Sequence, residues 1–156
     1  ISSASAMPAA AWPRIGRRQA RADEIEAMNY LKAFGLWLGF LAAAIGGAIM
    51  REKFLEPGFG PPGGRALGTL LVAAIIFGLI YAYVGRLTGA TRGSLVKLGL
   101  FWTILTMAFE FLFGHYVMGH SWDALWADYH VWQGRLWPLV LLVTLFGPLA
   151  ARRLRN

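Results

Sequence analysis

Residues 101–116 form an apolar run long enough to lie within a lipid bilayer, yet the run contains a carboxylate, Glu110. An ionisable side chain at that depth is costly, so such residues usually face other helices or a polar cavity and serve packing or function. This run limits the fold more than any other stretch. It requires a helix inside a membrane, with neighbouring helices around Glu110.

The composition also favours a membrane environment. Hydrophobic residues make up 57% of the 156 residues and charged residues only 15%, a share that a soluble domain of this size cannot bury. There is no cysteine, which excludes disulfides and thiolate chemistry. The net charge of +7 does not indicate nucleic-acid binding, because the basic residues flank apolar segments and form no basic–aromatic face.

Four apolar segments predict the architecture, at about residues 33–50, 66–84, 98–118 and 136–151. Each is close to the ~20 residues that a membrane-spanning helix needs. We expect residues 22–156 to form one domain, an all-α integral membrane four-helix bundle with short loops. Residues 1–21 are expected to be a disordered basic segment, residues 22–32 either an amphipathic helix or a solvated segment beside the membrane, and the Pro/Gly-rich residues 51–65 a loop.

The charges predict an orientation for these spans. The N-terminal segment, the second loop and the C-terminal tail carry most of the Lys and Arg residues, whereas the charges of the first and third loops cancel. Short loops rich in Lys and Arg remain in the cytoplasm. We therefore expect a multi-pass protein of the bacterial inner (cytoplasmic) membrane with both termini cytoplasmic.

Two further patterns concern surfaces. The first span carries a stripe of small residues at every fourth position, which lets another helix approach closely: Gly35, Gly39, Ala43 and Gly47. In the third loop, Ser121 is a good N-cap, and a row of large side chains follows at helical spacing. This row predicts an interfacial helix over about residues 121–132.

Glu110 is the principal candidate site residue. It lies eight residues before Met118, which places it ~12 Å below the outer boundary of its span. We expect its side chain to point into the bundle, close to Thr106, Thr144 and the small residues of the first span. Three roles stay open for it: a carboxyl group that locks helix packing, a proton or cation carrier, or a catalytic acid or base.

A second group of polar residues is expected at the outer rim of the bundle. His115 is five residues beyond Glu110, about 140° around the helix, so the two are not expected to form a dyad. The spacing of the His and Asp residues matches no compact metal motif, and we expect neither a metal nor a cofactor. The rim residues are His115, Tyr116, His120, Asp123, Asp128, His130 and Arg135.

The second half of the chain resembles a family of proteins. The residues that carry the resemblance are 109–122, Phe-Glu-Phe-Leu-Phe-Gly-His-Tyr-Val-Met-Gly-His-Ser-Trp, followed by Asp128-Tyr129 and Gly134-Arg-Leu-Trp137. This pattern is similar to one in small uncharacterised four-span bacterial membrane proteins. The resemblance implies the four-span architecture and brings no activity with it.

These observations favour a small integral membrane protein that acts through helix–helix contacts. Its expected partners are the lipid bilayer and either a second copy of the chain or a larger membrane complex. One alternative is a small proton- or cation-coupled transporter or channel that uses Glu110. Another is a membrane enzyme with a site at the outer rim, formed by His115, Asp128 and Arg135, that acts on a lipid or a quinone.

Overall fold

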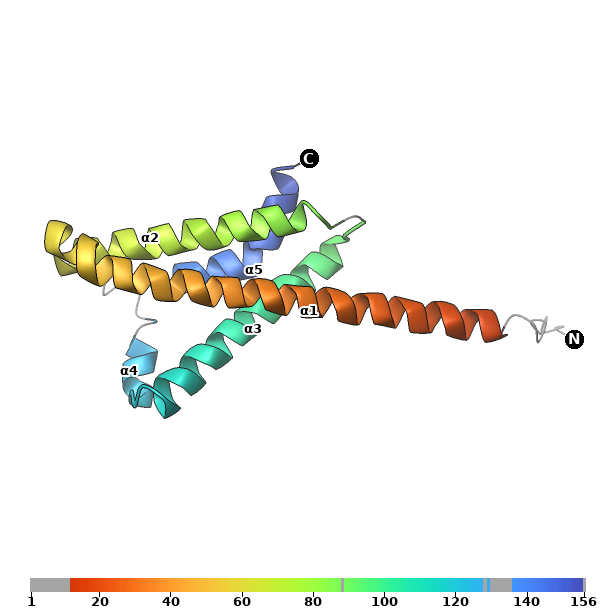
Figure 1. Ribbon diagram of the computed structural model, residues 1–156, viewed down its shortest axis with the longest axis horizontal. Helices are drawn as coiled ribbons and strands as arrows, with labels where there is room; N and C mark the ends of the chain where they lie inside the picture. The colour runs from red at the N-terminus through yellow and green to blue at the C-terminus, as the bar shows by residue number, and fades with distance from the viewer. Residues whose placement is uncertain (1–11, 88, 128, 130–135, 156) are drawn as a thin grey trace, which may run out of the picture. The chain divides into compact units, whose positions relative to one another are not determined.

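The computed structural model describes residues 12–87, 89–127, 129 and 136–155, with side chains from residue 30 onward (Figure 1). Within this part of the chain every regular element is a helix, which confirms the predicted all-α class. Two helical stretches, Tyr30–Val84 and Arg92–Tyr116, are long and apolar enough to cross a membrane. The elements are α1 (Trp12–Met50), the π-helix η2 (Arg51–Leu55), α2 (Glu56–Val84), α3 (Arg92–Tyr116), α4 (Trp122–Ala127) and α5 (Trp137–Arg153).

The chain divides into two compact units, the first ending at Gly35 and the second beginning at Leu36. In the first unit the described residues form one helical stretch, the part of α1 that begins at Trp12. Residues 12–21 are therefore helical where we expected disorder. Pro13 stands in the first turn, where its missing N–H breaks no bond, and the Ala and Arg residues that follow favour a helix. Residues 1–11 lie outside the described residues.

In the second unit, the end of α1 and the helix α2 run antiparallel and in contact (Figure 1). A Cβ atom at Gly47 would overlap the side chain of Val72, and one at Gly39 would meet Leu79 at 3.8 Å. Two residues of the small-residue stripe thus lie against α2 of the same chain. Gly35, in contrast, has open space around it.

The connection between α1 and α2 is not the irregular loop expected for residues 51–65. It is helical through η2 and the start of α2 except at Gly60, where φ is 72° and ψ is 164°. Pro57 stands in the first turn of α2, and Pro61 and Pro62 come directly after the break. Since proline is tolerated where a helix begins, these residues do not each interrupt the chain, and the reversal is confined to Gly60.

Replacing Gly60 with alanine should lower the free energy of unfolding by about 1–3 kcal/mol, because a side chain is strained in this backbone region. Denaturant titration of the detergent-solubilised protein would measure the loss. The matched control is Gly58→Ala, since a Cβ at Gly58 meets nothing within 4 Å and its φ is not positive. Equal losses for both variants would show that the reversal does not depend on Gly60.

Helix α5 packs against both α2 and α3. A Cβ at Gly99 of α3 would overlap the carbonyl oxygen of Leu145 in α5, so the two backbones touch at this crossing. Gly147 of α5 allows a similar approach to Ile80 of α2, where an added Cβ would lie 2.9 Å from the Ile80 Cδ1 atom. Glycine thus determines how closely α5 approaches both of its neighbours.

The core of the second unit surrounds Trp102 of α3, which is fully buried. Its ring meets Phe40 of α1 edge-on at 5.2 Å and Tyr83 of α2 edge-on at 5.8 Å, both favourable aromatic arrangements. Three helices therefore converge on one indole. This packing holds α3 in register, with Glu110 two turns further along the helix.

Candidate functional site

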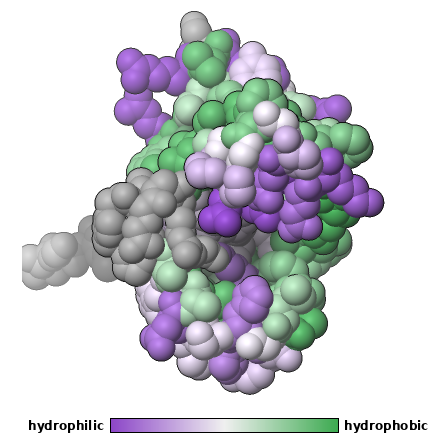
Figure 2. Space-filling model, turned by 90° about the vertical axis from the view of Figure 1, so that its left-hand side faces the viewer, coloured by the Kyte–Doolittle hydropathy of each residue, from purple (hydrophilic) through white to green (hydrophobic). Residues whose placement is uncertain are grey.

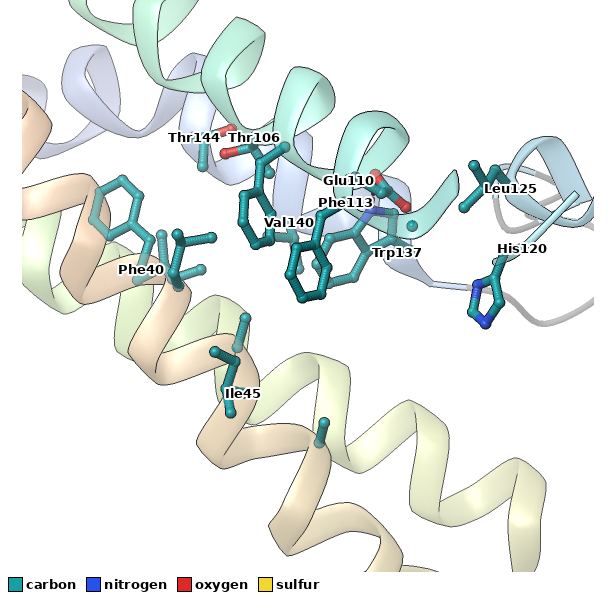
Figure 3. Close-up of a pocket in the computed structure, with 16 residues that line it drawn as sticks. Phe40, Ile45, Thr106, Glu110, Phe113, His120, Leu125, Trp137, Val140 and Thr144 are labelled. Atoms are coloured by element: carbon teal, nitrogen blue, oxygen red, sulfur yellow. Dashed lines mark hydrogen bonds between the residues drawn. The ribbon is translucent and has the colours of Figure 1, made fainter. Parts of the chain in front are cut away.

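Glu110 lies on α3, and its carboxylate holds two hydrogen bonds from other parts of the chain. The indole Nε1 of Trp137 donates to Oε2 at 2.7 Å, and the hydroxyl of Tyr129 donates to the same oxygen at 2.8 Å. Figure 3 shows the Glu110 and Trp137 side chains next to one another on the wall of a cavity. Both distances are short, as expected for hydrogen bonds to a carboxylate.

The two donors come from the segments that follow α3 in the chain. Trp137 is the first residue of α5, and Tyr129 stands in the turn after α4, where its N–H bonds to the Trp126 carbonyl oxygen. One carboxylate therefore ties α3 to the start of α5 and to the end of the α4 segment. We call Glu110, Tyr129 and Trp137 the Glu110 clamp.

Thr106 and Thr144 were expected beside Glu110, but their hydroxyls bond elsewhere. Thr106 Oγ1 accepts a hydrogen bond from the indole of Trp37 at 3.1 Å. Thr144 Oγ1 lies 3.1 Å from the hydroxyl of Thr103 and donates to the carbonyl oxygen of Leu141. Thr106 of α3 is thus bonded to α1, whereas Thr103 and Glu110 are both bonded to α5.

One cavity of about 400 Å³ is nevertheless lined by all three of these residues, Glu110, Thr106 and Thr144 (Figure 3). In Figure 3 the two threonines lie toward one end of the cavity and Glu110 with Trp137 further along it. The lining also includes Ala44 of α1. Most of the lining is apolar, and the polar residues in it are Thr106, Glu110, His120 and Thr144.

The expected rim residues gather only in part. His115 Nδ1 lies 2.9 Å from the His120 carbonyl oxygen, and its ring stacks on Trp122 at 3.9 Å and meets Tyr116 edge-on. Asp123 is exposed in the first turn of α4. His115 does not bond to Glu110, as expected from their angular separation. Three expected rim residues lie outside the described residues: Asp128, His130 and Arg135.

Among the described residues, no three His, Cys, Asp or Glu side chains lie close enough together to hold a metal ion. His115 Nδ1 contacts the His120 carbonyl oxygen, and the His120 backbone N–H bonds to the Gly114 carbonyl oxygen, while the His120 side chain lines the cavity.

Helix α4 covers residues 122–127 of the predicted segment 121–132, and residues 128 and 130–132 of that segment lie outside the described residues. The helix begins as expected. Ser121 Oγ accepts a hydrogen bond from the Ala124 N–H at 3.2 Å, the bond that an N-cap makes. The row of large side chains that follows packs partly on α3. Phe111 contacts the rings of Trp122, Trp126 and Tyr129.

Sequence reasoning missed Phe111 and Trp137 as partners in this site. One signal was present for Trp137: an indole N–H is a donor only, and a Trp at the start of an apolar helix requires an acceptor when it is partly buried. Phe111 directly follows Glu110, so the same helical turn supplies both the carboxylate and the aromatic surface on which α4 lies.

Comparison of the chain with models of protein families, with curated proteins and with solved structures finds no match. The functional argument therefore depends on the helices, the Glu110 clamp and the cavity.

Proposed function

We propose that the chain is a four-span protein of the bacterial cytoplasmic membrane that acts through contacts of its helices, as a homo-oligomer or as an accessory subunit. The observation that carries this proposal is the apolar outer surface of the helices. Large hydrophobic side chains are exposed on several of them, with Ile45 of α1 59%, Ile104 of α3 63% and Leu142 of α5 52% exposed. Exposing such apolar faces to water is unfavourable, whereas contact with lipid or with another helix is favourable.

The lengths of the helices support four crossings. The apolar stretch Tyr30–Val84 has 55 residues and would be ~80 Å long if it were straight, against a hydrocarbon thickness of ~30 Å. Because the chain reverses at Gly60, this stretch forms two arms. α3 would be the third span and α5, with 17 residues, the fourth. Arg152 and Arg153 at its end can extend toward the lipid head groups.

The polar surface supports the proposed orientation. Glu52 and Lys53 are exposed where α1 passes into α2, and Figure 2, which views that end of the molecule, shows hydrophilic surface there with hydrophobic surface on the flanks. Arg86 lies between α2 and α3, Arg92 is the first residue of α3, and Arg152, Arg153 and Arg155 lie at the end of α5. By the charge rule, the Lys- and Arg-rich ends would be cytoplasmic.

The Glu110 clamp favours the packing role over the carrier and the catalytic roles. Its Oε2 atom already accepts two hydrogen bonds. The Thr106 hydroxyl accepts from Trp37 and donates to the Trp102 carbonyl oxygen, and the hydroxyls of Thr103 and Thr144 are bonded to each other. A proton or cation path would need polar groups along the cavity, and most of the lining is apolar. The carboxylate is arranged to hold three segments of the chain together.

The proposal is tested by disulfide cross-linking in native membranes, which the absence of cysteine makes free of background. Single cysteines at Ile104 and at Leu142, both exposed, would probe the outer faces of α3 and α5. We expect at least one of them to cross-link to a second copy or to one partner protein. Cysteine at the fully buried Ile80 is the matched control. Absence of any cross-link, together with the mass of a monomer in detergent, would contradict the proposal.

A further inference from the structure

The cavity beside the Glu110 clamp has an apolar wall built from several helices. Ala44 and Ile45 of α1, Ile76 of α2, Phe113 of α3 and Val140 of α5 all line it. Its volume of about 400 Å³ lies in the range of small-molecule sites, ~300–1,000 Å³. An apolar cavity of this kind excludes water and takes up apolar molecules instead.

Most polar side chains of the lining already form hydrogen bonds within the protein. Thr106 and Thr144 are hydrogen-bonded within the protein, and Glu110 accepts from Trp137 and Tyr129. Among the described residues no Lys or Arg belongs to the lining, so an anionic head group would meet the Glu110 carboxylate with only the His120 imidazole as a possible counter-charge. The occupant should therefore be an uncharged hydrocarbon group.

The cavity also reaches the outer surface. Ile45 and Phe113 line it, and both are exposed, by 59% and 40%. They lie on α1 and α3, whose outer faces would contact lipid under the proposed function. A hydrocarbon chain in the bilayer could thus enter sideways, without passing a polar barrier.

We propose that this cavity binds an acyl chain of a membrane phospholipid, with the chain end against Ile76 and Val140 and the head group left outside. This inference rests on the proposed membrane location. Ile76 and Val140 are 2% and 1% exposed, so lipid that merely surrounds the protein does not reach them. Only a chain inside the cavity can.

The test uses the full chain in nanodiscs of phosphatidylcholine that carries a diazirine at the end of one acyl chain. After illumination, mass spectrometry locates the labelled residues. We expect labelling at Ile76 or Val140.

Ala44→Leu and Ala48→Leu would fill the cavity from its α1 wall and should reduce that labelling roughly tenfold, because they displace several methylene groups of the chain. Ala42→Leu is the matched control, since Ala42 is exposed and lies outside the lining.

Each outcome has a distinct meaning. Labelling confined to outward residues such as Ile104 would overturn the acyl-chain site while leaving the membrane location intact. Labelling of Ile76 or Val140 that all three leucine variants preserve would also overturn it. Displacement of the acyl label by decylubiquinone at equal concentration would assign the cavity to a quinone rather than to phospholipid. Failure to enter nanodiscs at all would instead contradict the proposed function.

Discussion

Replacing Glu110 with alanine is expected to lower the free energy of unfolding by about 3 kcal/mol. Hydrogen bonds to a charged group contribute ~1.5–3 kcal/mol each, and this carboxylate accepts one from Trp137 and one from Tyr129. Alanine would leave both donors without their acceptor in a partly buried place. Glu110→Gln should lose less, about 1–2 kcal/mol, since the amide oxygen can accept the same two bonds as a neutral group.

A double-mutant cycle measures the clamp itself. Glu110→Gln and Trp137→Phe would be made singly and together, and unfolding of each variant would be followed by denaturant titration in the same detergent. We expect a coupling energy of about 1 kcal/mol or more, the size found for residues in direct contact. Glu52→Ala is the control for loss of an exposed carboxylate, with an expected change within ~0.5 kcal/mol. If Glu110→Ala were as stable as the parent protein, the packing role would have no support.

The second large effect concerns the crossing of α3 and α5. Gly99→Ala is expected to cost about 2–3 kcal/mol, at the upper end of what overpacking usually costs, because the new Cβ would overlap the Leu145 carbonyl oxygen. A backbone atom cannot rotate out of the way as a side chain can. The helices would have to separate, and Gly99→Leu should prevent the native packing of α5 altogether.

The control for this crossing is Gly78→Ala. Gly78 is also within a helix, but a Cβ there meets nothing within 4 Å, so the substitution should be neutral or stabilise the protein by up to ~1 kcal/mol. Thermal unfolding in detergent, followed by circular dichroism, would compare the two variants. Equal stability of Gly99→Ala and Gly78→Ala would show that α3 and α5 do not approach as closely as described.

The helical fold could be predicted because hydropathy and length are properties of contiguous residues. Each apolar run that predicted a helix overlaps one of α1, α2, α3 and α5, and only residues 117, 118 and 136 of these runs lie outside them. The connection at residues 51–65 was predicted wrongly because proline and glycine were counted as breakers wherever they stood. Their effect depends on position: Pro61 and Pro62 begin a helical arm, and only Gly60 leaves the helical region.

The site could be predicted only in part. Glu110 was found because one carboxylate in an apolar run is visible in the sequence, and its separation from His115 follows from helical geometry. Its partners were not found. Trp137 and Tyr129 are 27 and 19 residues away, so their approach depends on how the segment between α3 and α5 folds. Thr144 was predicted as the neighbour of Glu110 because the sequence gives only the depth of each residue along a straight membrane span.

Single-cysteine accessibility tests the proposed four-span topology most directly. Cysteines would be placed at four exposed positions, Gly58, Ser94, Ser121 and Leu154, and intact cells would be treated with a membrane-impermeant maleimide. The proposed topology predicts labelling at positions 58 and 121 in intact cells, and at 94 and 154 only after the membrane is permeabilised. Labelling of positions 58 and 94 from the same side would contradict it, because α2 would then not cross the membrane.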